Sequence, residues 1–343
     1  MKKVLKKIIN TVLTCAGKFT GKKSMPEQPV RIGLIACHWL GDTFWASQTI
    51  PYLKQRFPGA EIHVFLRRDF TDLFYNMIVP ENMHLVPEVI SDRKRETFSW
   101  SKLITAARQY RPLNFDLVID LTGNRYSALF TRLLKPGYSI GFEGDELGAL
   151  YSMRVAADSH KRQRLLKVIQ EIGGIAAPAE LPQSPGTPLS FEDVCALHAL
   201  PLDAPIVLLA PKAGWAEKEW GIDNFAELAS ALSTEGFQII VLGMAADEAE
   251  CRRIIDRAGA GHAVFFAGTL KEVFALMQRS VIFIGGDSGL GHIAASFERC
   301  LTVMIFKATN PAELVPLGRK TFALDGRDKA IAVSEVLSCC RNK

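Results

Sequence analysis

Short apolar runs alternate with longer amphipathic stretches along this chain, and this alternation occurs in two series. The first series begins at residue 30 and the second at residue 205, and a proline-rich segment at 180–190 separates them. Strands that alternate with helices predict parallel sheets built from βαβ units, and a proline-rich segment is typical of a linker. We therefore expect an α/β chain with two facing Rossmann-like domains and a ligand cleft between them.

Three parts follow from this division: an N-terminal helix at 1–24, an N-terminal Rossmann-like domain at 25–180 and a C-terminal one at 181–343. Periodicity places the individual elements within them. The expected strands are 30–37, 61–66, 84–86, 115–121, 138–142, 205–211, 237–243, 263–267, 280–284 and 301–306. The expected helices include 43–57, 154–173, 222–235, 246–258, 270–278 and 330–339.

Composition excludes several classes of protein. Hydrophobic residues make up 48% of the 343, which is enough for two packed cores, so a disordered chain is excluded. The net charge of +5 does not by itself indicate a nucleic-acid partner. There are seven cysteines and no Cys-x-x-Cys pair. This usage predicts neither a disulfide framework nor a zinc site, and it fits a reducing cytosol.

The first 24 residues differ from the rest, because they contain seven lysines and no acidic residue. Their apolar residues fall on one face of a helix, at positions 4, 5, 8, 9, 12 and 13. No apolar run approaches the roughly 20 residues needed to span a bilayer. We expect residues 2–20 to bind an anionic membrane surface, which would make the protein peripheral on the cytoplasmic face; packing of this helix on its own domain is the alternative.

One glycine-rich stretch, GGDSGLGHIAASF at 285–297, follows a short apolar run and precedes apolar residues at helical spacing. The pattern predicts a strand, a tight turn and a helix start, with Asp287 or Ser288 as the N-cap. Backbone N–H groups at such a turn suit a phosphate. An ordinary capped turn without a ligand is the alternative. A hydrolase triad of Asp287, Ser288 and His292 is disfavoured because Gly-x-Ser-x-Gly is absent.

Each series also has a turn of interest directly after its first expected strand. Asp42 lies in the turn at 38–42, where it is either an N-cap or a general base that faces the ligand. Lys212 and Lys218 lie in the turn at 211–220, among small and aromatic residues. They are either solvated charges or a cationic clamp on a pyrophosphate.

Together these turns resemble glycosyltransferase family 9, the ADP-heptose:lipopolysaccharide heptosyltransferases. The resemblance covers about residues 30–325 and is most specific in four segments that occur in the family's order. The segments are RIGLIACHWLGDTFWASQTIPYLKQRFPGAEIHVF, VLLAPKAGWAEKEWGIDNFAELASAL, QIIVLGMAADEAE and GGDSGLGHIAAS. It implies the GT-B fold and a single inverting displacement at an anomeric carbon without a metal.

The resemblance also implies roles for individual residues. Asp42 would be the catalytic base that deprotonates the acceptor hydroxyl. Lys218 would contact the donor phosphates, and the donor site would be lined by Asp287, Ser288, Gly289 and His292. Lys212 is a further candidate phosphate contact, from the cationic turn described above. The family's Phe-Gly-Pro-Thr segment appears here as Phe-Lys-Ala-Thr, so Lys307 and Thr309 are further candidate donor contacts. His38-Trp39-Leu40 also departs from the arginine and small polar residues that the family often has before Gly-Asp.

The expected reaction moves heptose or a related sugar from an ADP-sugar to a lipopolysaccharide core or a similar lipid-linked surface glycan. The donor is a substrate, and no cofactor, metal or nucleic acid is expected. Two alternatives stay open: a GT-B enzyme with a UDP or GDP donor or an epimerase, and a catalytically silent homologue that binds a nucleotide or glycan.

Overall fold

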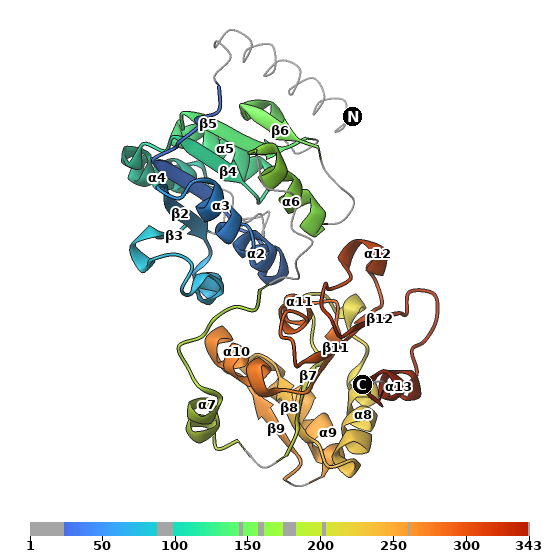
Figure 1. The fold of residues 1–343 in the computed structure, drawn as a ribbon. Coiled ribbons are helices and arrows are strands. Elements are labelled where there is room, and N and C mark those ends of the chain that lie inside the picture. Colours follow the sequence, from blue (N-terminus) through green and yellow to red (C-terminus); the bar gives the residue numbers. More distant parts are fainter. Residues whose placement is uncertain are drawn as a thin grey trace. The chain divides into compact units, whose positions relative to one another are not determined.

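The computed structural model describes residues 24–87, 99–143, 147–156, 161–173, 183–200, 204–259 and 261–341. The chain divides into two compact units, Met1–Ala179 and Glu180–Lys343 (Figure 1). The basic helix predicted at 1–24 lies outside the described residues, apart from Ser24.

The first unit is built on a six-stranded parallel sheet in the order β3-β2-β1-β4-β5-β6. Its central strands are buried, except for Arg31 at the start of β1, and are rich in branched apolar residues, as expected for a parallel sheet that is covered on both faces. The strands are β1 (Arg31–Ile35), β2 (Glu61–Leu66), β3 (Met83–Leu85), β4 (Leu117–Asp120), β5 (Tyr138–Phe142) and β6 (Met153–Val155).

Helices of the first unit connect these strands, and their inner faces form its core. In α4 and α5 the buried residues Leu103, Ala107 and Phe130 pack against Ile35 and Val118 of the sheet. The α-helices are α2 (Leu40–Ser47), α3 (Ile50–Arg56), α4 (Trp100–Tyr110), α5 (Arg125–Leu134) and α6 (Lys161–Glu171). The 3₁₀ segments are η1 (Arg68–Phe74), η2 (Pro80–Asn82), η5 (Arg111–Leu113) and η6 (Gly148–Leu150).

Two expectations for this unit were wrong. The single helix expected at 43–57 is broken into α2 and α3, because Pro51 has no N–H to continue the helix and instead occupies the first turn of α3. The helix expected at 154–173 is shorter, since residues 153–155 form the edge strand β6 and α6 begins only at Lys161.

The second unit repeats the plan, with six parallel strands in the order β12-β11-β10-β7-β8-β9. When numbered from the first strand of each unit, both sheets have the Rossmann order 3-2-1-4-5-6. The strands are β7 (Ile206–Ala210), β8 (Gln238–Leu242), β9 (Ala263–Phe266), β10 (Ile282–Gly286), β11 (Leu301–Phe306) and β12 (Thr321–Asp325). The sequence did not predict β12, which is only half-buried.

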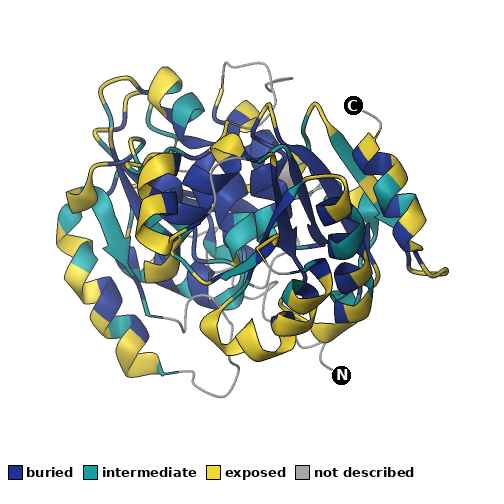
Figure 2. Cartoon of the chain, turned by 90° about the horizontal axis from the view of Figure 1, so that it is seen from below, coloured by how far each residue is buried: buried dark blue, intermediate teal, exposed yellow. Residues whose placement is uncertain are grey.

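A large apolar cluster joins α8, α9 and α13 to one face of this sheet, with Phe225, Ile254 and Val336 fully buried. Figure 2 shows the resulting pattern of buried strands and of helices whose outer faces are exposed. The helices are α7 (Phe191–His198), α8 (Ile222–Thr234), α9 (Glu248–Ala258), α10 (Leu270–Arg279), α11 (Gly289–Ala294), α12 (Pro311–Leu314) and α13 (Val333–Arg341). Two 3₁₀ segments, η7 (Ala216–Lys218) and η8 (Ala245–Asp247), follow β7 and β8.

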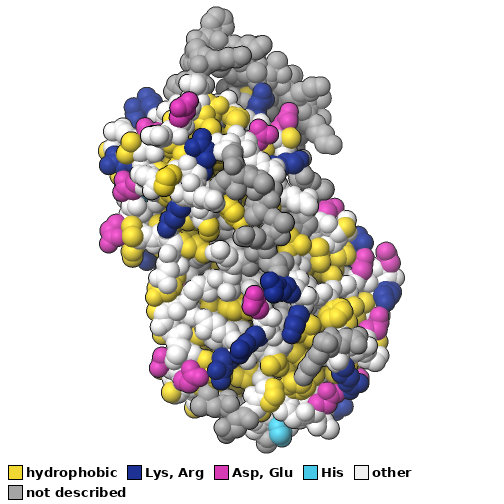
Figure 3. Space-filling model, viewed as in Figure 1, with side chains coloured by type: hydrophobic (Ala, Val, Ile, Leu, Met, Phe, Trp, Pro, Cys, Tyr) yellow, Lys and Arg dark blue, Asp and Glu magenta, His cyan; other side chains and the backbone are white. Residues whose placement is uncertain are grey.

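No helix in the described ranges is long and apolar enough to cross a membrane. On the face drawn in Figure 3, Lys and Arg side chains lie scattered among acidic and apolar ones. The six cysteines within the described residues are all buried free thiols.

A pair of histidines links β2 to β3 in the first unit. The rings of His63 and His84 are stacked with centroids 5.1 Å apart, and the His63 Nδ1 to His84 Nε2 distance is 2.8 Å. Phe65 and Tyr110 also contact the His84 ring. Burial, with His63 beside it, lowers the pKa of His84 to about 4, and burial lowers the pKa of His63 although Glu61 opposes this.

This pair is expected to make the first unit sensitive to acid. Above pH 6.5, the ordinary pKa of histidine, both states are neutral. Below it the unfolded state binds a proton that folded His84 does not bind until about pH 4, so stability falls by about 1 kcal/mol between pH 6.5 and 5 once solvent screening of this half-buried ring is included. Hydrogen exchange of β2 and β3 measures this loss. His84→Gln should reduce it and the exposed His262→Gln should not; equal loss in both variants would contradict the prediction.

Candidate active site

The strand order reverses at one point in each sheet, between β1 and β4 in the first unit and between β7 and β10 in the second. Connections leave such a point in opposite directions, so the turns at the carboxyl ends of the two strands leave an opening where α/β proteins bind ligands. The three turns selected from the sequence all lie at these two points: the turns after β1, β7 and β10.

In the second unit, Lys218 and Asp287 meet across the reversal point. Lys218 ends η7 in the turn after β7, and Asp287 directly follows β10, which pairs with β7 in parallel. The Lys218 Nζ lies 2.5 Å from Asp287 Oδ2. The same ammonium lies 4.6 Å from the centre of the Trp215 ring, which is a favourable cation–π distance. The lysine is therefore held in place by two groups before any ligand binds.

Asp287 is almost fully buried and has several donors around its carboxylate. The Thr309 hydroxyl donates to the same Oδ2 at 2.7 Å, and His292 Nε2 lies 3.8 Å from Oδ1. Asp287 is only 5% exposed, and a carboxylate buried to this extent needs nearby donors to offset the loss of its hydration. The structure thus brings together four predicted donor-site residues, with Asp287 at their centre.

Lys212 is placed differently. Its Nζ donates to Glu219 Oε2 at 2.8 Å and to Glu250 Oε2 at 2.9 Å, and Glu219 also accepts from the Ala213 N–H. The hydrogen bond that Lys212 donates to Glu219 raises the pKa of Lys212, the one to Glu250 adds to this, and partial burial opposes it. Because two carboxylates already surround this ammonium, an additional anion would compete with them. A donor contact by Lys212 stays a prediction.

The remaining predicted residues surround the turn after β10. Ser288 is the N-cap of α11, one of the two N-cap residues expected from the sequence, but its hydroxyl makes no capping hydrogen bond. Its Oγ is buried without a hydrogen-bond partner among the described residues. Gly289 begins α11, and Lys307 lies exposed just beyond the carboxyl end of β11.

In the first unit, Asp42 lies in the first turn of α2, directly after β1. The N-cap is Trp39, so the N-cap interpretation of Asp42 was wrong. His38 Nδ1 lies 2.7 Å from Asp42 Oδ2. The same Nδ1 lies 3.0 Å from the Trp39 backbone N, which only donates, so this ring nitrogen either accepts from Trp39 or donates to Asp42. Asp42 is 20% exposed and can thus be reached by a ligand.

A group that the sequence did not reveal supports this turn from β4. The hydroxyl of Thr122 accepts from the Cys37 N–H at 2.8 Å and donates to the Ile35 carbonyl, which joins the ends of β1 and β4. Asp120 is fully buried and accepts from the Tyr151 hydroxyl at 2.7 Å and from the Thr122 N–H. Burial raises the pKa of Asp120, while these hydrogen bonds oppose the shift. The sequence pattern that could have indicated this group is Asp-Leu-Thr-Gly at 120–123, at the end of the strand predicted at 115–121.

Within the described residues, no group of three or more His, Cys, Asp or Glu side chains is placed to hold a metal ion. The Asp42 group belongs to the first unit and the Lys218–Asp287 group to the second.

Two Rossmann-type sheets in one chain, each with polar groups at its reversal point, have the architecture of GT-B glycosyltransferases. Residues 103–335 match the model of glycosyltransferase family 9 (heptosyltransferase). The chain belongs to this family and is a glycosyltransferase.

Among curated proteins, the chain is similar to lipopolysaccharide heptosyltransferase 3 of Escherichia coli K12, with 28% identity over 79% of this chain and 80% of that protein. Among solved structures, it is similar to Escherichia coli ADP-heptose lps heptosyltransferase II, with a TM-score of 0.73 and 20% identity over 90% and 97% of the two chains. The Escherichia coli heptosyltransferase WaaC with ADP gives a TM-score of 0.71 and 18% identity over 90% and 98%.

Proposed function

We propose that this enzyme transfers heptose from ADP-heptose to a lipopolysaccharide core, with inversion and without a metal ion. The observation that carries the proposal is the position of Lys218, which Asp287 and Trp215 hold at the reversal point of the second sheet. The relatives named above support the donor and the acceptor, since one was solved with ADP and another is a lipopolysaccharide heptosyltransferase.

In the proposed reaction, Asp42 accepts the proton of the acceptor hydroxyl while that oxygen attacks the anomeric carbon of the donor. The bond between this carbon and the β-phosphate oxygen breaks, and ADP leaves with the electron pair. Negative charge therefore grows on the diphosphate, where the Lys218 ammonium and the N–H groups of the turn at Ser288 and Gly289 stabilise it. One direct displacement inverts the anomeric configuration.

The donor can be tested by calorimetry with ADP, UDP and GDP, each with and without EDTA. We expect ADP to bind at least about 10-fold more tightly than the other two, a difference of about 1.4 kcal/mol, with no effect of EDTA. Tighter binding of UDP or GDP would replace ADP-heptose by another donor. Dependence on a metal would contradict the proposed role of Lys218. Turnover of ADP-heptose with a deacylated lipopolysaccharide core then tests the acceptor.

Gly286 offers a test of how Lys218 is positioned. A Cβ at Gly286 would lie 2.9 Å from the Lys218 carbonyl oxygen, whereas a Cβ at Gly214 has no atom within 4 Å. Gly286→Ala should therefore push the lysine turn away and cost about 1–3 kcal/mol in stability, with weaker ADP binding. Gly214→Ala in the same turn is the control and should match the wild type. Thermal unfolding and calorimetry measure both effects, and equal behaviour of the two variants would count against this positioning.

We also propose that the basic segment at 2–20 keeps the enzyme at the inner face of the cytoplasmic membrane, where a lipid-linked acceptor is reached. Its lysines and its apolar face support this. Deletion of 2–20 should reduce sedimentation with anionic vesicles and leave turnover of a deacylated acceptor intact. Unchanged sedimentation would contradict the proposal.

A further inference from the structure

The lysine turn at 211–220 has an exposed middle and more buried ends. It leaves β7 after Ala210 and enters α8 at Ile222. Residues 214–217 are exposed, so packing does little to fix their conformation. Lys218 follows directly, and a long flexible turn would leave its ammonium many positions to occupy. Contacts near the two ends of the turn therefore decide where Lys218 lies.

Glu219 joins the two ends of this turn. Its Oε2 accepts from the Lys212 Nζ at 2.8 Å and its Oε1 from the Ala213 N–H at 3.3 Å. These two hydrogen bonds are the closing contacts of the turn. The Glu219 side chain is 16% exposed and that of Lys212 is 22%, so water screens this ion pair less than a pair on the open surface. The closing contacts hold the immediate neighbour of Lys218 against the start of the turn.

Other contacts fix the backbone on either side of Glu219. The Lys218 carbonyl lies so near Gly286 that a Cβ there would be 2.9 Å from its oxygen. The indole N–H of Trp220 donates to the Ile331 carbonyl at 2.9 Å, and the tryptophan is only 4% exposed. Glu219 thus lies between two anchored residues, and its side chain links them to the start of the turn.

The neighbouring side chains at 218 and 219 have different partners. The Lys218 ammonium contacts Asp287 and Trp215, whereas the Glu219 carboxylate contacts Lys212 and the backbone beside it. Asp287 fixes the end of the lysine side chain, and the closing contacts fix the backbone from which it extends. A cation held at both points needs little further ordering when a diphosphate binds, so less of the binding free energy is lost.

We propose that Glu219 is a positioning residue of the transfer reaction: its closing contacts hold Lys218 where the diphosphate of the donor binds. This inference rests on the proposed function. It gives Lys212 an indirect role through Glu219, in place of the direct donor contact predicted from the sequence. Glu219 is itself negatively charged and would repel a nearby diphosphate, so its charge and its positioning role have opposite effects on donor binding.

Glu219→Ala is expected to weaken ADP binding about 10-fold and to lower kcat about 10-fold, because Lys218 must then be ordered at each turnover. Glu219→Gln removes the same charge but keeps an oxygen that accepts from Lys212 or the Ala213 N–H, so its ADP affinity should return to within about 3-fold of the wild type. Calorimetry and steady-state kinetics measure these effects. Tighter ADP binding in either variant, or equal affinities of the two variants, would overturn the inference.

Two controls lie in the same unit. Glu250→Ala removes a carboxylate from beside Lys212 and leaves both closing contacts in place. Asp325 accepts from the Arg327 guanidinium at 2.7 Å and from the Arg327 N–H at 3.2 Å, so Asp325→Ala also removes contacts to a cation and to the backbone. Both variants should bind ADP as the wild type does. A 10-fold loss of affinity in either would show that the effect is not specific to Glu219.

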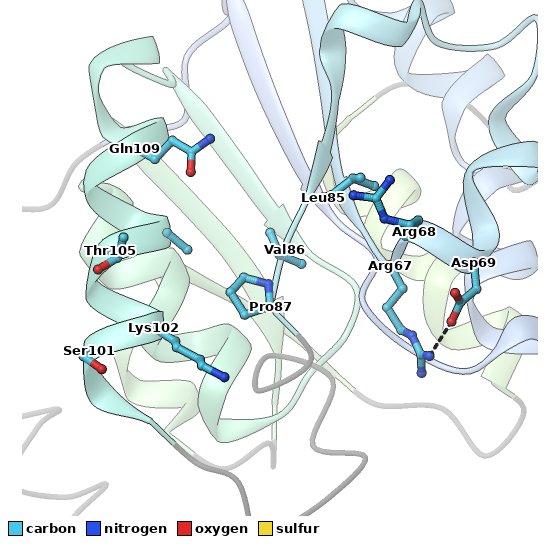
Figure 4. A pocket seen from close by; sticks show the side chains of 11 residues that line it. Arg67, Arg68, Asp69, Leu85, Val86, Pro87, Ser101, Lys102, Thr105 and Gln109 are labelled. Atoms are coloured by element: carbon cyan, nitrogen blue, oxygen red, sulfur yellow. Dashed lines mark hydrogen bonds and ion pairs between the residues drawn. The ribbon is translucent and has the colours of Figure 1, made fainter.

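A third control lies in the first unit, where an ion pair stands in the wall of a hollow of about 500 Å³ (Figure 4). Arg67 Nη2 donates to Asp69 Oδ2 at 2.7 Å, and the Phe70 ring lies 5.1 Å from the same guanidinium. Asp69→Ala therefore removes a contact between a cation and a carboxylate in the unit that holds none of the predicted donor contacts. Its ADP affinity should equal that of the wild type.

A double-mutant cycle decides how Lys212 acts. Lys212→Met should weaken ADP binding by less than about 10-fold, since the contact between Glu219 and the Ala213 N–H remains. If Lys212 acts only through Glu219, the double variant K212M/E219A should bind ADP no more weakly than E219A. Losses that multiply in the double variant would mean that Lys212 contacts the donor itself, and its indirect role would be wrong.

Hydrogen exchange of the ligand-free enzyme separates this inference from the proposed function. The amides of Lys218 and Glu219 donate to carbonyls within the turn, and that of Ala213 to Glu219 itself. In Glu219→Ala these three amides should exchange about 10-fold faster, and those of β7 at the wild-type rate. If UDP or GDP binds instead of ADP, and more weakly in this variant, the proposed donor is wrong and the role of Glu219 stands. If ADP-heptose is used but exchange and affinity do not change, the role of Glu219 alone is rejected.

Discussion

Asp42→Asn is expected to lower kcat by about 100- to 10,000-fold, the usual contribution of a general base. Asparagine has the size and shape of aspartate but does not accept the proton of the acceptor hydroxyl. ADP binding should be unchanged, because the predicted donor contacts lie in the second unit. Measurement of kcat together with calorimetric ADP binding therefore separates loss of the base from loss of the donor site.

The environment of Asp42 makes this variant informative. The Asp42 carboxylate contacts His38 Nδ1, and the amide of asparagine has both an acceptor and a donor with which to keep that contact, so the fold of the turn should survive. Asp72→Asn is a control of the same chemistry in the same unit, on η1, and should keep full activity. Turnover of Asp42→Asn at the wild-type rate would show that another group removes the proton.

Much of the fold could be predicted from the sequence because the central strands are continuous apolar runs. The strands β2, β5 and β11 have the predicted bounds. Edge strands carry a weaker signal. In β6 only Val155 is buried, and its three residues merge in the sequence with the helix that follows, while β12 alternates weakly and is half-buried. The central strands of a parallel sheet are the most buried. Their apolar runs therefore allow these strands to be predicted from the sequence more accurately than the edge strands.

The candidate site shows a similar limit. Turns at the ends of strands could be found from residues close in the sequence, as with Asp287 and Ser288 after β10. The ion pairs that fix each charge depend on the tertiary fold instead. Glu250, which pairs with Lys212, is 38 residues away and on another element, and no local pattern connects them.

Lys218→Gln is expected to lower kcat by about 100- to 1,000-fold, the effect of removing a group that stabilises charge in the transition state. ADP should bind more weakly as well, since the diphosphate would lose its cation in both ground and transition states. Exposed Lys320→Gln in the same unit is the control and should be silent in both measurements.

Loss of Lys218 should also destabilise the second unit, and this second effect allows the two roles of the lysine to be separated. Removing the ammonium leaves the buried Asp287 carboxylate with Thr309 and His292 alone, at a cost of about 3 kcal/mol in the free energy of unfolding. The double variant K218Q/D287N removes both charges, so its stability should return toward that of the wild type while its activity stays low. Recovery of activity in the double variant would mean that Lys218 serves only to compensate Asp287. A double variant that is as unstable as K218Q would mean that loss of the ion pair does not cause the lost stability. The packing of the Lys218 side chain would then be its source.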